Sequence, residues 1–390
     1  MRTIEEINAK IKSGKVVVLT AEQVVGLVKE KGVKAAAREV DVVTTGTFGP
    51  MCSSGALFNI RQSTPKIKCG GGKATLDGVP AYAGFAAADL MLGCTALPDD
   101  DPRNAVYPGL FLRGGAHIIE KLLHGEAVKL EVKAHGTDCY PRKEYVTELA
   151  LKDFNSATLL DPRNCYQLYN VAVNLGEKTI YTYMGVLKPR LGNANYATAG
   201  ALSPLLNDPR LRTVGIGTRV FLGGGQGYVF YPGTQHVPNP PRDERGLPLT
   251  PSATLAVVGD LKTMSPEFIR AASLTGYGAS LAVGLGIPLP ILDEEVMADC
   301  AVSDADITYP IVDYAEAYPL GRAGSLGRAS MAELMTGQIE VDGKKVVTGS
   351  LCSRVKARQV AGALQTAIAE GAFFLTRAAA PLPGSELAQG

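Results

Sequence analysis

Glycine is the feature that most constrains the fold of this chain. It occupies 44 of the 390 positions, a larger share than the ~7% usual in proteins, and it gathers in clusters such as residues 69–72 and 215–227. The 24 prolines add further breaks. Because glycine adopts backbone conformations closed to other residues and proline ends regular elements, the sequence predicts short elements joined by many tight turns.

Between these clusters, local patterns predict both helices and strands. Two capping boxes, Thr3-x-x-Glu6 and Thr20-x-x-Gln23, each begin a predicted helix, the second over residues 21–31. Residues 353–370 predict an amphipathic helix, and Asp342-Gly343 between apolar alternations predicts a hairpin. Short apolar runs predict strands at residues 16–19, 42–45, 130–133, 171–173, 220–222 and 228–230. This mixture predicts an α/β or α+β fold with mixed sheets and glycine-rich loops, in a strand order that remains open.

Two longer segments bear on domain organisation. Residues 271–292 are uncharged but contain four glycines and two prolines, so we expect a buried helix followed by a loop rather than a membrane span. Residues 232–251 contain six prolines, which predicts a long surface loop or linker. We therefore expect one unit over residues 1–390, in one lobe or in two that meet near 232–251.

The charge balance excludes several classes of partner. The chain has 39 Lys and Arg against 38 Asp and Glu, with no dense basic run, which argues against binding to nucleic acid or to a membrane surface. The N-terminus lacks the apolar core of a signal peptide. Seven scattered cysteines form no C-x-x-C pair and no disulfide framework. We expect a cytoplasmic protein with no metal bound by the chain.

The segment Gly223 to Gly227 follows a predicted strand and allows two interpretations. Its backbone N–H groups could cradle an anion, but the G-x-G-x-x-G pattern is loose and no helix follows it. A tight hairpin turn is the simpler interpretation, and the pattern favours it.

Cys52 is the most promising thiol. It follows Pro50 by two residues, and Ser53, Ser54 and Gly55 come directly after it. Proline suits the first position of a helix, so we expect the sulfur in a first helical turn, where free N–H groups would stabilise a nucleophilic thiolate. A buried structural cysteine is an equally common outcome for such a context.

Two other cysteines are candidates. Cys139 precedes Arg142 and Lys143, whose charges could favour its anion or bind a carboxylate, and Cys69 has three lysines near it. The remaining cysteines, Cys94, Cys165, Cys300 and Cys352, are expected at core or neutral positions.

Six segments of the sequence resemble segments of a known protein family. The two cysteine motifs are residues 46–55 (GTFGPMCSSG) and 136–142 (GTDCYPR), and the others are residues 221–225, 259–264, 312–314 and 342–344. With them the chain resembles the homocysteine biosynthesis proteins, formerly a domain of unknown function and later assigned as L-aspartate semialdehyde sulfurtransferases. The resemblance covers nearly the whole chain.

This resemblance implies conversion of L-aspartate semialdehyde to L-homocysteine with sulfide or persulfide sulfur held on a cysteine. Cys52 and Cys139 match the family's motif cysteines. We assign the sulfur to Cys52 on the helix argument and a resolving or assisting role to Cys139. Family members often carry CBS or ferredoxin-like modules, and none is expected within residues 1–390. A separate ferredoxin-type iron–sulfur protein would then supply two electrons, and a homo-oligomer is compatible with the sequence.

Several residues are expected to bind the substrate. Arg142 could grip its carboxylate with a guanidinium fork, Ser53 and Ser54 flank the sulfur, and Gly224 and Gly225 are weaker candidates. Two alternatives remain: another cysteine-dependent transferase acting on a small acid, and a non-catalytic protein that binds an anionic or phosphorylated ligand.

Overall fold

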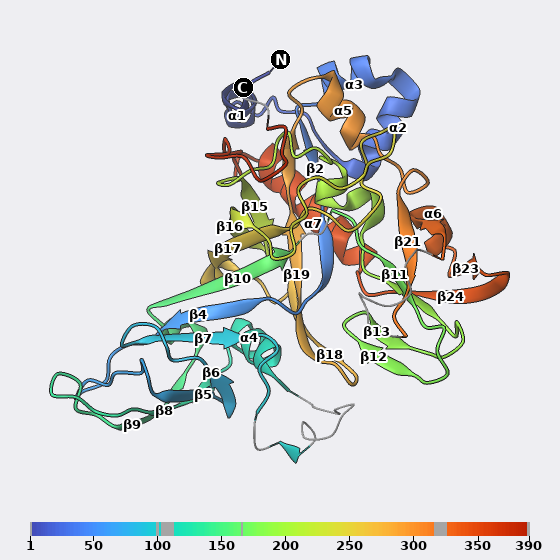
Figure 1. Ribbon diagram of the computed structural model, residues 1–390. Coiled ribbons are helices and arrows are strands. Elements are labelled where there is room, and N and C mark those ends of the chain that lie inside the picture. Colours follow the sequence, from blue (N-terminus) through green and yellow to red (C-terminus); the bar gives the residue numbers. More distant parts are fainter. Residues whose placement is uncertain (1, 99–100, 103–112, 165–166, 316–325, 388–390) are drawn as a thin grey trace.

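The computed structural model describes residues 2–98, 101–102, 113–164, 167–315 and 326–387. Its centre is a nine-stranded sheet in which all described neighbouring strands are antiparallel, with a six-stranded and a four-stranded sheet on either side of it (Figure 1). The predicted mixture of helices and sheets is therefore confirmed. No helix in the described ranges has the length and apolar character needed to cross a membrane.

The nine-stranded sheet contains both hairpins and strands brought together from distant parts of the chain. Eight strands form its main path, in the order β18 (Ile269–Leu274), β19 (Gly278–Gly286), β15 (Arg219–Leu222), β16 (Gly225–Pro232), β17 (Leu255–Asp260), β10 (Ser156–Asn164), β4 (Gly55–Asn59) and β7 (Asp89–Gly93). The ninth, β3 (Thr47–Met51), pairs with β19. The proline-rich segment predicted near residues 232–251 connects β16 and β17, which are neighbours in this sheet.

The C-terminal helix α7 (Arg354–Ala369) packs against β3 and β19. Glycine permits this close approach, because a Cβ at Gly284 or Gly286 would lie 2.9 or 3.0 Å from the Val360 side chain. The predicted N-cap is present, since the Ser353 side chain accepts a hydrogen bond from the Lys356 N–H. Figure 1 shows α7 between the nine-stranded sheet and the N-terminal helices.

The N-terminal region forms a small layer at one end of the molecule. It contains α1 (Ile4–Lys12), α2 (Ala21–Lys31), α3 (Val33–Glu39) and the later helix α5 (Glu294–Cys300), with a three-stranded sheet of β1 (Val18–Thr20), β2 (Val42–Thr44) and β20 (Pro288–Pro290). Both predicted capping boxes are formed with reciprocal hydrogen bonds. The predicted starts of α1 and α2 are thus confirmed.

A six-stranded sheet with its own apolar core lies on one side. Its order is β22 (Arg328–Ser330), β21 (Thr308–Asp313), β11 (Val171–Val173), β14 (Ala194–Tyr196), β24 (Lys344–Ser350) and β23 (Gln338–Val341), and α6 (Met331–Leu334) and the hairpin of β12 (Ile180–Thr182) and β13 (Gly185–Leu187) accompany it. Asp342 and Gly343 have φ values of 49° and 72°, as the predicted hairpin requires.

A four-stranded sheet extends the molecule on the opposite side (Figure 1). It has the order β6 (Val79–Ala81), β5 (Lys73–Leu76), β8 (Val128–Lys133) and β9 (Glu144–Leu149), with α4 (Gly115–Leu123) beside it. Short 3₁₀ turns complete the described elements at Leu151–Asp153, Gly200–Leu202, Pro204–Leu206 and Leu261–Thr263.

The buried helix predicted within residues 271–292 is wrong. This segment contains the end of β18, all of β19 and β20. All nine residues of β19 are buried, because neighbouring elements cover both of its faces. A strand covered on both faces has a continuous apolar sequence, which periodicity alone cannot distinguish from a buried helix.

Candidate active site

A cavity of about 690 Å³ lies between the nine-stranded sheet and the six-stranded sheet. Residues from the β3–β4 and β18–β19 connections form one wall, and residues near β11, β12, β21 and β24 form another. Loop residues between β16 and β17, including Gln235 and Ser252, complete the lining. Among the lining residues that the structure describes, none carries a formal charge.

Cys52 lines this cavity, and no other described cysteine does. Its side chain is half-buried, and the Tyr277 hydroxyl donates a hydrogen bond of 3.8 Å to its sulfur. The Cys94 thiol donates to the Cys52 carbonyl oxygen at 3.2 Å, and the Cys94 N–H donates to the Ser54 carbonyl oxygen at 2.9 Å. These hydrogen bonds fix the backbone of the β3–β4 turn, so the Cys52 side chain is held at the cavity wall.

The predicted helix start at Cys52 is wrong. Pro50 and Met51 belong to β3, and Cys52 lies in the tight turn that leads to β4. Proline is acceptable here because β3 pairs with β19 alone among the described strands, so no second neighbour needs the missing N–H. The helix-dipole argument for a thiolate therefore does not apply, and the Tyr277 hydroxyl donates to the sulfur instead.

The two serines after Cys52 differ in position. Ser53 lines the cavity beside the thiol. Ser54 is 2% exposed and is not among the lining residues, and its N–H donates to the Met51 carbonyl oxygen. Ser53 is thus placed to meet a ligand, whereas Ser54 supports the turn.

Tyrosines form much of the polar surface of the cavity. The Tyr183 hydroxyl is hydrogen-bonded to those of Tyr169 at 2.5 Å and Tyr314 at 3.2 Å. Burial, and then the neighbouring Tyr314 and Tyr169, raise the pKa of Tyr183, which keeps its hydroxyl neutral at physiological pH. The Tyr183 ring also contacts the Tyr277 ring edge-on, with centroids 6.1 Å apart. This connects the tyrosine cluster to the donor at Cys52.

Cys139 and Arg142 lie elsewhere. Cys139 is exposed in the β8–β9 loop of the four-stranded sheet, with its sulfur 3.6 Å from the Thr137 hydroxyl. Arg142 donates to the Thr64 carbonyl oxygen and lies over the Tyr145 ring. Figure 1 shows this sheet on the opposite side of the molecule from the β12–β13 hairpin that borders the cavity. The structure thus does not bring Cys139 or Arg142 to the cavity that Cys52 lines.

Gly224 and Gly225 line a different, open groove together with Thr158, Asp260 and Phe373. Gly223 and Gly224 are the central residues of the β15–β16 hairpin, with φ values of 58° and 94°. The hairpin interpretation of this glycine cluster is confirmed.

The other described thiols are buried. Burial raises the pKa of Cys69 to about 11 and raises those of Cys300 and Cys352 as well. A neutral thiol is a poor nucleophile, so these cysteines are unsuited to sulfur transfer. Cys165 lies outside the described residues.

Sequence patterns did not identify Tyr169, Tyr183, Tyr277 or Ser280 as site residues, although all four line the cavity. They come from separate segments that only the folded chain brings together. The one local signal is Gly276-Tyr277-Gly278, which places an aromatic side chain at the tip of a hairpin.

Comparisons with known proteins agree on one family. Residues 16–375 match the family described as homocysteine biosynthesis enzymes, sulfur-incorporation. The L-aspartate semialdehyde sulfurtransferase of Methanosarcina acetivorans is 46% identical over 377 residues, which cover 96% of this chain and 71% of that protein. The protein of the same name from Methanocaldococcus jannaschii is 46% identical over 389 residues, covering 96% and 72% respectively.

A more distant relative has no assigned activity. An uncharacterized protein of Methanothermobacter thermautotrophicus is 28% identical over 320 residues, covering 80% of this chain and 68% of that protein. No solved structure matches the chain significantly.

Proposed function

Because this chain belongs to the family of sulfur-incorporating homocysteine biosynthesis enzymes, we propose that it converts L-aspartate semialdehyde to L-homocysteine, with Cys52 as the sulfur carrier. Its sulfurtransferase role in homocysteine biosynthesis follows from the family and from relatives 46% identical over most of the chain. The observation that supports Cys52 is its position, since of the six described cysteines it alone lines the cavity.

The proposed reaction balances with an external reductant. The aldehyde, hydrogen sulfide, two electrons and two protons give the thiol and water. Sulfur adds to the electrophilic carbonyl carbon, water leaves to give a thioaldehyde, and two electrons with two protons reduce this to the thiol. If the sulfur arrives as a persulfide on Cys52, breaking its sulfur–sulfur bond requires two further electrons. A ferredoxin-type iron–sulfur protein is the proposed source of electrons.

The cavity residues support this chemistry. A hydrogen bond from the Tyr277 hydroxyl stabilises the thiolate left on Cys52 when the sulfur–sulfur bond of its persulfide breaks. The hydrogen bond from the Cys94 thiol to the Cys52 carbonyl oxygen holds the β3–β4 turn in place while the covalent bond to the Cys52 sulfur forms and breaks. Hydroxyl groups and the amides of Asn170 and Gln235, rather than cations, are the polar side chains that the described lining offers to the substrate.

The test uses L-aspartate semialdehyde, a persulfide donor that loads sulfur onto Cys52, and titanium(III) citrate as a low-potential reductant that supplies the electrons for both reductions. The wild-type chain should form homocysteine, and Cys52→Ala should lower the rate by at least about 1,000-fold, as expected when a covalent nucleophile is removed. Circular dichroism should show an unchanged fold. Homocysteine formation at the wild-type rate by Cys52→Ala would show that Cys52 is not the sulfur carrier. Homocysteine formation without the aldehyde would favour a different transferase.

Cys139→Ala is the matched control for sulfur loading. Cys139 is exposed and outside the cavity, so after exposure to a persulfide donor this variant should still gain one sulfur atom on Cys52, whereas Cys52→Ala should not. Peptide mass spectrometry measures both. Loss of loading in the Cys139 variant would instead support a relay between the two thiols.

A further inference from the structure

Ser280 is an unusual residue in the cavity wall. It lies in β19, is 1% exposed, and lines the same cavity as Cys52. Its hydroxyl oxygen has no hydrogen-bond partner among the residues that the structure describes. A buried hydroxyl without a partner destabilises a folded chain, whereas the small apolar side chains at Ala279 and Ala282 in the same strand carry no such penalty. The hydroxyl at position 280 therefore requires an explanation.

The strand register brings Ser280 close to Cys52. Leu281 of β19 pairs with Met51 of β3 in an antiparallel ladder. The next position along each chain is Ser280 on one side and Cys52 on the other. Cys52 lies in the turn just beyond the end of this ladder, and the cavity that both residues line shows that their side chains reach the same space.

A hydroxyl in this place can act on an oxygen of the substrate. It has one hydrogen to donate and two lone pairs, and no described residue uses any of them. Addition of sulfur to an aldehyde shifts an electron pair onto the carbonyl oxygen, and a buried donor aimed at that oxygen stabilises the developing charge. The donor must lie near the Cys52 sulfur, because the carbon that the sulfur attacks also carries the oxygen that the donor binds.

We propose that Ser280 binds the carbonyl oxygen of the aldehyde and stabilises the oxyanion formed when sulfur adds to it; this rests on the proposed function. In the step, a carbon–sulfur bond forms and the carbonyl π bond breaks, with its electron pair moving to oxygen. The proton that the oxygen takes up comes from the S–H group of the attacking sulfide or persulfide. No electrons enter or leave in this step.

The experiment compares Ser280→Ala, Ser280→Thr and Ser273→Ala with the wild-type chain in the homocysteine assay. Ser280→Ala should lower kcat/KM for the aldehyde by about 100-fold to 1,000-fold, as for loss of one oxyanion donor. Ser280→Thr keeps the hydroxyl and should recover most of the activity. Ser273 is an exposed serine on the adjacent strand β18, so its variant should match the wild type.

Two further readouts distinguish this role from a structural one. Ser280→Ala should have an unchanged or higher Tm, because it removes an unpaired buried group, and Cys52 should still take up sulfur at the wild-type rate. A fall in Tm, a loss of sulfur loading, or a kcat/KM within about two-fold of the wild type would overturn the assignment. If the wild-type chain itself forms no homocysteine, the proposed function fails, and this inference fails with it.

Discussion

At the scale of single residues, burial divides the described thiols into two groups. Cys52 and Cys139 reach solvent, whereas Cys69, Cys94, Cys300 and Cys352 are buried. Only the thiolate is alkylated, and burial raises the pKa of Cys69 to about 11. Iodoacetamide at pH 8 should therefore label Cys52 and Cys139 first, and labelling of Cys69 should increase only as the pH approaches 11.

Peptide mass spectrometry over a series of reaction times and pH values would measure these rates. A control in denaturant should label all six described thiols at similar rates, because unfolding removes the effect of burial. Equal labelling of Cys69 and Cys52 in the folded protein at pH 8 would contradict the difference in burial described here.

The sequence singled out Cys52, and the structure places it at a cavity, but the helix start expected around it was wrong. Proline two residues earlier suits a helix start and an edge strand equally, and only the pairing of β3 with β19 shows which applies. Tyr277 and Ser280 lie more than 200 positions after Cys52 in the sequence, so no local pattern could place them beside its thiol. Arg142 is near Cys139 in sequence, and folding leaves both outside the cavity.

At the scale of elements, the β15–β16 turn gives a direct test of backbone strain. Gly224 has a φ of +94°, and a Cβ there would lie 3.0 Å from the Ser265 Cβ. Gly224→Ala should lower the free energy of unfolding by about 1–2 kcal/mol, the usual penalty for a left-handed conformation in a residue with a side chain. Chemical denaturation would measure the change.

Gly26 supplies the matched control. It lies in the interior of α2 at an ordinary φ, and a Cβ there would meet no atom within 4 Å. Gly26→Ala should raise the free energy of unfolding by about 0.5–1 kcal/mol, because alanine loses less backbone entropy in a helix. If both variants shift stability in the same direction, the assigned turn geometry is incorrect.

Elements with local signals were the ones that the sequence predicted well. The capping boxes of α1 and α2 and the Asp342-Gly343 hairpin depend on neighbours within four residues, and all are present. β19 was missed because its apolar run reflects burial by β3, β15, β18 and α7, which come from distant segments. Its identity as a strand depends on tertiary pairing rather than on its own periodicity.

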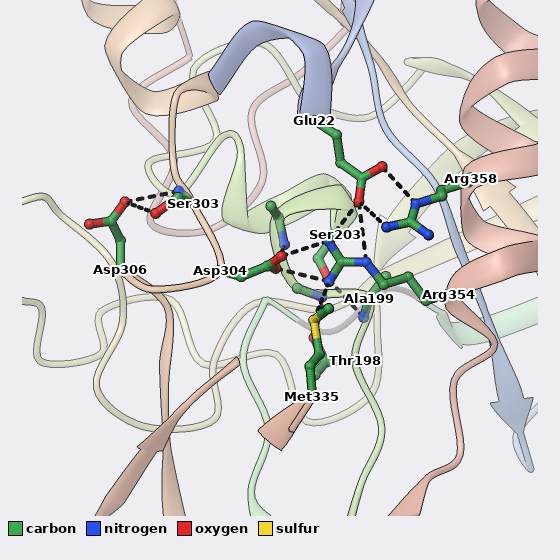
Figure 2. A network of polar contacts seen from close by, with 12 residues as sticks. Glu22, Thr198, Ala199, Ser203, Ser303, Asp304, Asp306, Met335, Arg354 and Arg358 are labelled. Carbon is green, nitrogen blue, oxygen red and sulfur yellow. Dashed lines mark hydrogen bonds and ion pairs between the residues drawn. The ribbon is translucent and has the colours of Figure 1, made fainter. Parts of the chain in front are cut away.

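At the scale of the whole molecule, a polar network joins separate parts of the chain (Figure 2). The Arg354 guanidinium, at the start of α7, donates to Glu22 of α2 at 2.6 Å and to Asp304, in the connection between α5 and β21, at 2.6 Å. Arg358 donates to the same Glu22 carboxylate. The network thus ties the N-terminal layer to the connection that leads into the six-stranded sheet, one wall of the cavity.

Glu22 makes this connection sensitive to pH. Burial alone would raise its pKa, but hydrogen bonds from Arg358 and Arg354 outweigh burial, so the pKa is lowered from its ordinary value of 4.5. A carboxyl group whose pKa is lower in the folded chain stabilises that chain above the unfolded value. This contribution is lost as the pH falls below 4.5 and through the lowered pKa.

Arg354→Gln should therefore destabilise the chain most near neutral pH. The pair is partly open to solvent, so we expect a loss of about 1–3 kcal/mol at pH 7, less than for a fully buried ion pair. The difference from the wild type should narrow below pH 4.5, as Glu22 becomes protonated in both proteins. Urea denaturation at pH 7 and at lower pH would measure this difference.

Arg190→Gln is the matched control. It breaks the exposed pair with Glu177 and should leave the denaturation midpoint almost unchanged. An effect of Arg354→Gln that stays constant with pH would show that lost packing, not lost charge, is responsible.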